Sequence, residues 1–238
     1  MAFKIDTITG LGYLSGLTRL TIVVNNLTTI DISQNTNLEA LDLYGNQFTE
    51  EFLNNLPLSN SLTYLNFGGN SIVNFDPVNA LPSGLTGLDL YNNQIVTFDP
   101  TLPLPSGLIQ LVLNGNNIVT FNPTLALPSG LTGLYLNNNQ IVTFDPPNLL
   151  PSSLTNLSLN NNQIVTFNPT LNLPISLTYL NLGSNEMTTA GYTASEPWAN
   201  AMTVIPGRGN IYFGDNVNSP SGTNLKTILI AKGWTIIA

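Results

Sequence analysis

The sequence of 238 residues contains no cysteine and no histidine. Without cysteine it can form no disulfide, no thiolate nucleophile and no cysteine-ligated zinc or iron–sulfur site. Without histidine it has no Ser-His-Asp triad, no histidine general base and no histidine metal ligand. These absences remove the commonest catalytic and metal-binding chemistries. We therefore predict that the chain is not an enzyme and needs neither a cofactor nor a metal.

Charge is also scarce, because only 8% of the residues are charged, against roughly 25% in an average soluble protein. Thirteen acidic and five basic residues give a net charge of −8, and no basic residue lies between Arg19 and Arg208. Contacts to nucleic-acid phosphates need lysine and arginine, so we predict no nucleic-acid binding. Polarity comes instead from amides, since the chain contains 35 asparagines.

Long apolar runs are missing as well. No stretch of 18 apolar residues occurs, which predicts no membrane span. Residues 1–13 lack the apolar core of a Sec-type signal peptide, so we predict none. The chain is nevertheless 42% hydrophobic, which is enough to bury a core.

What the sequence does contain is a repeat. The pattern L-x-x-L-x-L-x-x-N-x followed by an apolar residue occurs eight times, with small variations, at spacings of 21, 24 and then five times 23 residues. The copies begin at Leu17, Leu38, Leu62, Leu85, Leu108, Leu131, Leu154 and Leu177. A fixed period of this length predicts a solenoid, in which stacked repeats share one apolar core.

Over residues 17–187 these motifs resemble the leucine-rich repeat family. The stretch from Ile30 to Leu38 is similar to the DVS-x-N-T-x-L linker of Bacteroidota-type members. Residues 188–238 are similar to terminal segments of repeat proteins from bacteria and bacteriophages. The resemblance implies a non-enzymatic recognition or scaffolding module that binds through a broad concave sheet.

The predicted fold class is an α/β repeat solenoid. The alternating core of each repeat predicts a short strand, and stacked copies predict a parallel sheet. The repeated asparagine follows the strand, where its amide can satisfy buried backbone groups. This predicts a structural ladder of Asn46, Asn70, Asn93, Asn116, Asn139, Asn162 and Asn185.

The other half of each repeat predicts an extended, polyproline-like convex side. Two prolines per repeat exclude a long helix there. A phenylalanine recurs at a spacing of 23 residues and predicts a spine inside the coil; its members are Phe75, Phe98, Phe121, Phe144 and Phe167. An Asp-Pro or Asn-Pro pair follows each of them. Asp76, Asp99 and Asp145 in these pairs could suggest calcium, but we interpret them as turn residues.

Segments outside the period should close the ends. We expect an N-terminal cap or anchor over residues 1–16, in which Phe3, Ile5 and Leu11 could cover the first repeat or pair with another protein. The solenoid should span 17–187, and a small α/β cap should span 188–238. In that cap, a capping-box pattern predicts a helix over 194–203, and a second helix from Asn224 should precede a strand over 234–237. We interpret Arg208, between two glycines, as a turn residue.

Side chains that point outward from the strands are the candidate binding residues. Five of the eight tyrosines fall in these columns, and tyrosine is favoured at binding surfaces. The candidates are Tyr44, Tyr64, Tyr91, Tyr135, Tyr179, Asp42 and Asp89. β-propensity alone could also place tyrosine on an exposed sheet. Asp42 and Asp89 could resemble the two catalytic carboxylates of a glycosidase in their separation, but a flat sheet is a poor active site.

Two functions are consistent with these features of the sequence. The first is recognition of a protein or glycan through the concave sheet, on a cell or phage surface. The second is a passive part of a bacteriophage virion or bacterial surface assembly, which contacts other virion or surface proteins through its ends. For both we expect a location on a virion, on a cell surface or outside the cell.

Overall fold

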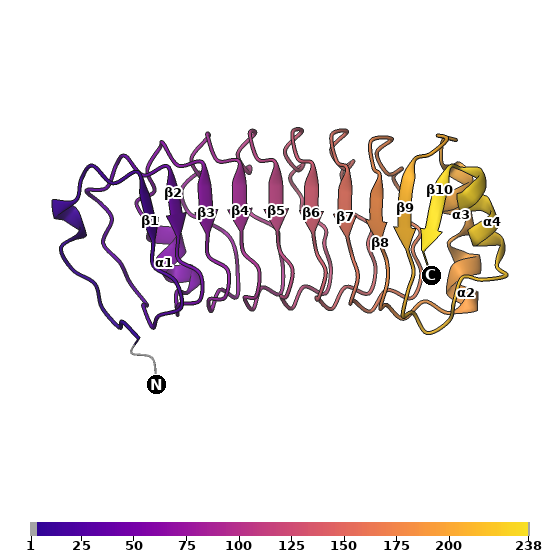
Figure 1. Ribbon diagram of the computed structural model, residues 1–238, viewed down its shortest axis with the longest axis horizontal. Coiled ribbons are helices and arrows are strands. Elements are labelled where there is room, and N and C mark those ends of the chain that lie inside the picture. The colour runs from indigo at the N-terminus through magenta and orange to yellow at the C-terminus, as the bar shows by residue number, and fades with distance from the viewer. Residues whose placement is uncertain (1–3, 238) are drawn as a thin grey trace.

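The computed structural model describes residues 4–237, which form one parallel sheet of ten short strands in chain order (Figure 1). This confirms the predicted α/β repeat solenoid. The strands are β1 (Arg19–Thr21), β2 (Ala40–Asp42), β3 (Tyr64–Asn66), β4 (Gly87–Asp89), β5 (Gln110–Val112), β6 (Gly133–Tyr135), β7 (Asn156–Ser158), β8 (Tyr179–Asn181), β9 (Gly209–Tyr212) and β10 (Trp234–Ile237). The helices are η1 (Leu11–Tyr13), α1 (Glu50–Asn55), α2 (Thr189–Ala194), α3 (Glu196–Ala201) and α4 (Asn224–Ala231).

The leucines of successive repeats are in register. Leu41 of β2 pairs with Leu65 of β3, which pairs with Leu88 of β4, and all three are fully buried. Because side chains alternate along a strand, the residues on either side of each leucine point outward. The sheet therefore has an apolar inner side and an outer side, which we call the sheet face.

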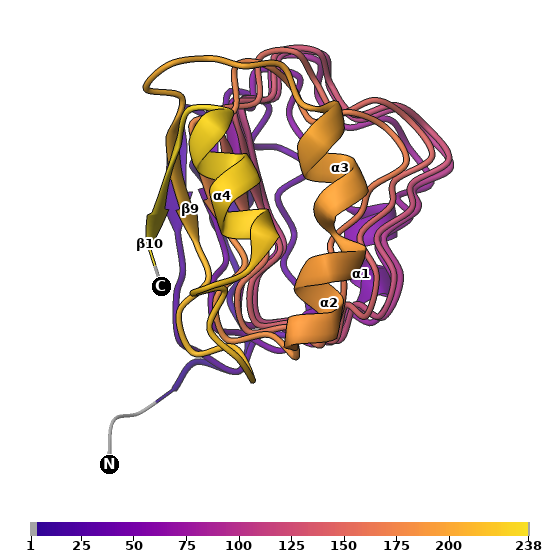
Figure 2. The ribbon, with the colours of Figure 1, turned by 90° about the vertical axis from the view of Figure 1, so that its right-hand side faces the viewer.

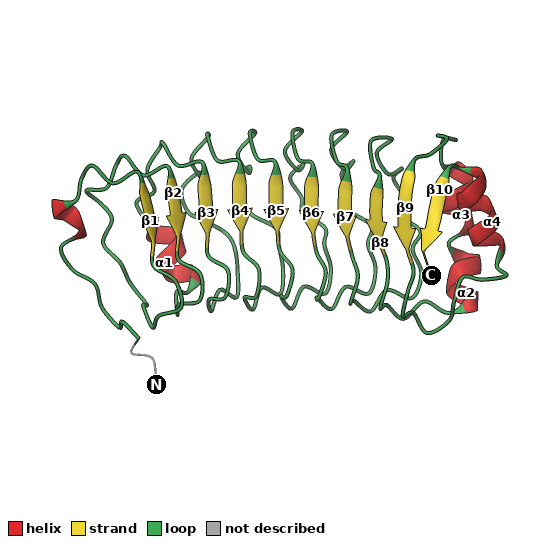
Figure 3. Cartoon of the chain, in the orientation of Figure 1, coloured by secondary structure: helices red, strands yellow, loops and turns green. Residues whose placement is uncertain are grey.

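The coil is close to straight. In the view along its axis the successive turns nearly superimpose, with the strands on one side and α1 on the opposite side (Figure 2). Strands make up only a small part of each turn, and the connections are loops (Figure 3). The predicted extended convex side agrees with this shape, because wide helices on that side would force the turns to fan out.

A stack of phenylalanines fills the side of the core away from the sheet, as predicted. The rings of Phe75 and Phe98 lie 5.6 Å apart between centroids, and the following pairs lie 6.1 Å apart with nearly parallel planes. Trp198 of α3 closes the stack edge-on, 4.8 Å from Phe167. Aromatic contacts thus link five successive repeats to the C-terminal segment.

The helix α1 interrupts the otherwise extended convex side and was not predicted. Its repeat lacks the Asx-Pro pair found in the later ones, and its first proline in this region, Pro57, follows the helix. Glu50 and Glu51 lie in the first turn, where they interact favourably with the helix dipole. The prediction of extended structure holds only where the prolines recur.

The aspartates of the Asx-Pro pairs do more than form local turns, so that interpretation was incomplete. Oδ1 of Asp99 accepts hydrogen bonds from the backbone N–H of Thr124 at 2.7 Å and from its hydroxyl at 2.9 Å. Asp76 and Thr101 make the same pair of contacts one repeat earlier. Each carboxylate therefore ties its own repeat to the next.

The C-terminal segment contains two short helices, α2 and α3, where one helix over 194–203 was predicted. The proposed capping box is wrong, because α2 begins earlier and the Thr188 side chain caps it. The hydroxyl of Ser195 instead accepts a hydrogen bond from the N–H of Phe167 and donates to the carbonyl of Gly191. The predicted helix α4 and strand β10 are confirmed. Trp234 of β10 pairs with Gly209 of β9, so these two strands are 25 residues apart, whereas the regular repeats have a period of 23.

The N-terminal segment lies along the first repeat as a loop with one turn of 3-10 helix. The N–H of Ile5 donates to Oδ1 of Asn25, and the N–H of Asn26 donates to the carbonyl of Ile5, both at 2.9 Å. Leu11 is buried, whereas Ile5 is 47% exposed. Phe3, which we expected to take part, lies outside the described residues.

Candidate binding face

Buried asparagines position the end of every strand from β2 to β8. In one repeat, Nδ2 of Asn162 donates to the carbonyls of Leu136 and Leu159 at 3.0 and 2.9 Å, and Oδ1 accepts from the N–H of Ile141 at 2.9 Å. The same pattern recurs at Asn46, Asn70, Asn93, Asn116, Asn139 and Asn185. Each amide satisfies buried groups of two repeats and so fixes the position of the neighbouring outward residues.

The strand register brings most of the candidate residues together near the N-terminal half of the sheet face. Tyr64 lies beside Gly87, and Asn66 lies between Asp42 and Asp89. The two aspartates are thus two strands apart, about 10 Å at ordinary strand spacing. Tyr135 and Tyr179 lie further along the sheet.

Glycines provide space for the tyrosine rings against the sheet. A Cβ on Gly68 would lie 2.5 Å from the ring of Tyr91, and one on Gly87 would lie 2.9 Å from the ring of Tyr64. Tyr44 and Tyr91, which flank Gly68 in the neighbouring repeats, stack with their ring centroids 5.4 Å apart. The absence of a side chain at these glycines therefore lets the rings rest close to the backbone.

Tyr64 and Asp89 form a polar pair across neighbouring strands. The Tyr64 hydroxyl donates to Oδ2 of Asp89 at 2.6 Å. Burial raises the pKa of Asp89, the negative charge of Asp42 raises it further, and the Tyr64 hydrogen bond acts in the opposite direction. Burial also raises the pKa of Tyr64, as does its contact with the carboxylate. Asp89 is thus a half-buried carboxylate with a neutral neighbour.

A hollow of about 280 Å³ opens beside this pair. Gly87 and Asp89 contribute to its lining from β4, Tyr64 borders it from β3, and Gln110 borders it from β5. The remaining lining residues are Thr86 and Ile109. The hollow therefore combines an aromatic side chain, a carboxylate and an amide on the sheet face.

Sequence reasoning missed two residues near the C-terminal end. Tyr212 pairs with Asn181, and its ring lies 5.1 Å from that of Tyr179. Its place could have been found, because Ile211 and Phe213 repeat the strand signature around it. Arg208 is 4% exposed and not merely a turn residue.

The guanidinium of Arg208 joins the cap to the last regular repeat. Nη2 donates to the carbonyl of Pro174 at 2.7 Å, and Nε donates to that of Leu177 at 3.3 Å. The group also lies over the Trp234 ring, 4.8 Å from its centroid. Burial lowers the pKa of Arg208. No sequence pattern indicated this contact.

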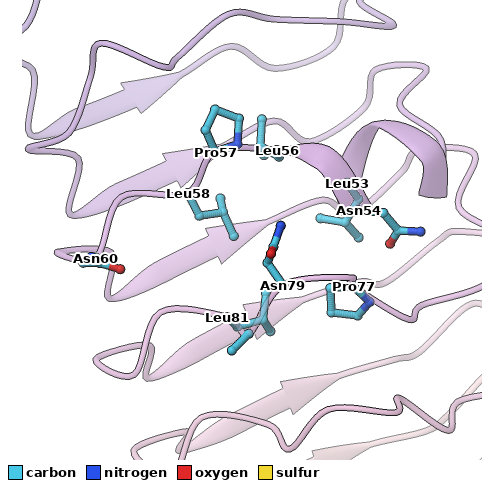
Figure 4. Close-up of a pocket in the computed structure, with 10 residues that line it drawn as sticks. Leu53, Asn54, Leu56, Pro57, Leu58, Asn60, Pro77, Asn79 and Leu81 are labelled. Atoms are coloured by element: carbon cyan, nitrogen blue, oxygen red, sulfur yellow. The ribbon is translucent and has the colours of Figure 1, made fainter.

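A second hollow, of about 240 Å³, lies beside α1 on the side of the coil away from the sheet (Figure 4). Leu53, Leu58, Pro77 and Asn79 are among its lining residues. Oδ1 of Asn54 is buried without a hydrogen-bond partner in the part of the chain that the structure describes. This hollow is separate from the candidate residues of the sheet face.

The raised pKa of Asp89 predicts a pH-dependent gain in stability on replacing Asp89 with asparagine. A carboxyl whose pKa is raised by folding destabilises the native state when it is charged, and this penalty disappears as the pH falls through the folded-state pKa. Asp89→Asn should therefore raise the Tm at pH 7, and the difference from wild type should close near pH 4. Thermal melts by circular dichroism between pH 3 and 8 will measure this, with exposed Glu186→Gln as the matched charge control. A Tm gap independent of pH would contradict the assignment.

Comparison with known proteins identifies the fold. The Leucine Rich Repeat family model matches residues 37–58. The functional domain of InlJ from Listeria monocytogenes is 28% identical with a TM-score of 0.66, over 98% of this chain and 46% of that one. The chain is a leucine-rich repeat protein. The search of curated proteins found no match.

Two further leucine-rich repeat structures share the fold. YopM from Yersinia enterocolitica is 23% identical with a TM-score of 0.56, over 90% of this chain and 45% of that one. An internalin, InlF, from Listeria monocytogenes is 22% identical with a TM-score of 0.56, over 94% and 62%. This leucine-rich repeat chain thus spans 45–62% of the length of these three structures.

The ladder of this leucine-rich repeat protein is made of amides. The InlJ domain includes a cysteine ladder, whereas this chain has no cysteine. Among residues 4–237, no helix has the length and apolar character needed to cross a membrane.

Proposed function

We propose that this leucine-rich repeat chain is a non-enzymatic module that binds a protein through its sheet face. The observation that supports this most directly is the tyrosine group at β2–β4, where Tyr44, Tyr64 and Tyr91 are held in place by stacking and by a hydrogen bond. Tyrosine supplies a large contact area at a low entropic cost. A surface that is rigid before binding loses less entropy when a partner is bound.

The shape of this surface favours a macromolecule over a small substrate. Small-molecule sites are concave and bury most of their ligand, whereas the sheet face has shallow hollows such as the one at Gly87. Solenoids commonly bind partners over an extended sheet of this kind. A glycan would use the same aromatic and amide groups, and it is the alternative ligand class.

Display on a cell surface is part of the same proposal. Presentation on a virion is the alternative location. Binding of a protein to the exposed sheet face is compatible with either location.

The alternative function, assembly through the ends, is favoured by one observation. Apolar side chains are exposed at the N-terminal end of the coil, where Tyr13 is 94% exposed and Leu14 and Val24 are each 53% exposed. β1 also pairs on one side only among the described strands. Such an end could pack against another protein.

Selection from a peptide library tests the binding proposal. A phage-displayed library of random 12-residue peptides is panned against the immobilised full chain. Enriched clones should lose at least tenfold in affinity for the double variant Tyr91→Ala and Tyr135→Ala, because it removes aromatic contact area from the sheet face. The Tm of this variant should stay within a few degrees of wild type, since both rings are partly exposed.

Matched variants elsewhere make the result specific. Leu149→Ala with Ile175→Ala removes two exposed apolar side chains from the proline-rich side, where they are 66% and 69% exposed, and should leave binding unchanged. Clones that bind the tyrosine variant normally contradict the proposal. Clones lost instead on Tyr13→Ser with Leu14→Ser favour assembly through the end.

A further inference from the structure

We infer that the hollow at Gly87 receives an arginine side chain of the partner, which lies against the ring of Tyr64 and the carboxylate of Asp89. This inference rests on the proposed function and names the chemistry that the sheet face recognises. Three observations support it: the distribution of charge along the chain, the hydrogen-bonding groups of the hollow, and the aromatic side chain at its border.

The charge distribution favours a cationic partner over the middle of the coil. Residues 20–207 contain eleven acidic residues and no basic one, and all five basic residues of the chain lie outside this range. Like charges at an interface are strongly unfavourable, and opposite charges speed association and select partners. On the sheet face, Asp42 and Asp89 carry this negative charge, so a basic side chain is attracted to the strands β2–β4.

The hollow at Gly87 presents hydrogen-bond acceptors without a cation. Oδ2 of Asp89 accepts from the Tyr64 hydroxyl, whereas Oδ1 has no partner among residues 4–237. The Gln110 side chain is exposed and also has no partner in that range. The hydroxyl of Thr86 is already used, because it donates to the carbonyl of Thr63 at 3.1 Å. A half-buried carboxylate that has a neutral hydrogen-bond donor, Tyr64, and a second carboxylate, Asp42, two strands away is stabilised by a cation.

The planar shape of guanidinium fits this place better than a lysine ammonium does. Guanidinium stacks on aromatic rings and binds carboxylates through two parallel N–H groups. Tyr64 supplies the ring, Asp89 and Gln110 supply the oxygens, and Gly87 lets the Tyr64 ring lie close to the sheet. Ile109, 45% exposed, adds an apolar wall for the methylenes of the arginine stem.

Titration with a single amino-acid derivative tests the inference. N-acetyl-arginine amide is added to the 15N-labelled full chain, and amide resonances are followed by NMR. The amide signals of Gly87, Asp89 and Gln110 should shift together with millimolar affinity. N-acetyl-citrulline amide, which has nearly the same shape without the charge, should shift them at least fivefold less. Nα-acetyl-lysine amide, which keeps its side-chain ammonium group, should bind at least twofold more weakly than the arginine derivative.

Variants and an inorganic cation complete the test. Asp89→Asn should weaken arginine binding at least fivefold, while Glu186→Gln, with the same change in net charge, should not alter it. Equal shifts with citrulline, equal binding of lysine, or unchanged binding by Asp89→Asn overturns the inference. So do the same shifts produced by calcium chloride, because they assign the hollow to an inorganic cation.

The two proposals fail in different ways. If selected peptides depend on the sheet face but arginine leaves the Gly87 signals unmoved, only this inference is wrong. If selected peptides bind without the sheet face, the proposed function is wrong whatever the arginine derivative does.

Discussion

Replacing Asn162 with leucine should lower the free energy of unfolding by about 3–6 kcal/mol, because it leaves several buried backbone groups without partners. The lost contacts are the hydrogen bonds to the carbonyls of Leu136 and Leu159 and the one from the N–H of Ile141. Leucine is similar in size, so the main effect is the loss of polar contacts. Guanidinium denaturation followed by circular dichroism measures the change.

The adjacent residue provides the control. Gln163 is exposed, and its backbone N–H donates to the carbonyl of Ile141, a contact that leucine preserves. Gln163→Leu should change the stability by no more than about 0.5 kcal/mol. If Asn162→Leu and Gln163→Leu unfold at the same denaturant concentration as wild type, the asparagine ladder does not stabilise the coil.

Replacing Gly209 with alanine should lower the free energy of unfolding by about 4 kcal/mol or more, because the new methyl group has no room. Gly209 begins β9 with φ +139°, and a Cβ there would lie 1.9 Å from the carbonyl oxygen of Thr178. The neighbour is backbone of the preceding repeat, so it cannot rotate away. Pairing of β9 with β8 has to be lost or shifted, which detaches the cap from the solenoid.

The same turn contains a matched glycine. Gly207 also has a positive φ, +65°, but a Cβ there would meet no atom within 4 Å. Gly207→Ala should therefore show only the backbone cost, about 1–2 kcal/mol. Equal denaturation midpoints for Gly207→Ala and Gly209→Ala would show that the close approach to Thr178 is unimportant.

Much of the sheet face was predictable because the period of the sequence fixes the register. Once the repeated leucines are aligned, Asp42, Asn66 and Asp89 must fall in one column. The role of the glycines could not be read in the same way. Gly68 and Gly87 make room for rings that come from neighbouring repeats, and the direction in which a ring leans depends on all the side chains around it.

The sequence alone determined the solenoid, the parallel sheet, the Asn ladder positions and the Phe stack, because each depends on one pattern that repeats in every coil. The three-dimensional structure decided the Tyr64–Asp89 hydrogen bond, the hydrogen bonds between Asp99 and the following repeat and the hydrogen bond from Arg208 to the carbonyl of Pro174. These contacts join residues 25 to 34 positions apart. They depend on rotamers and on the irregular ends, where the period no longer constrains the chain.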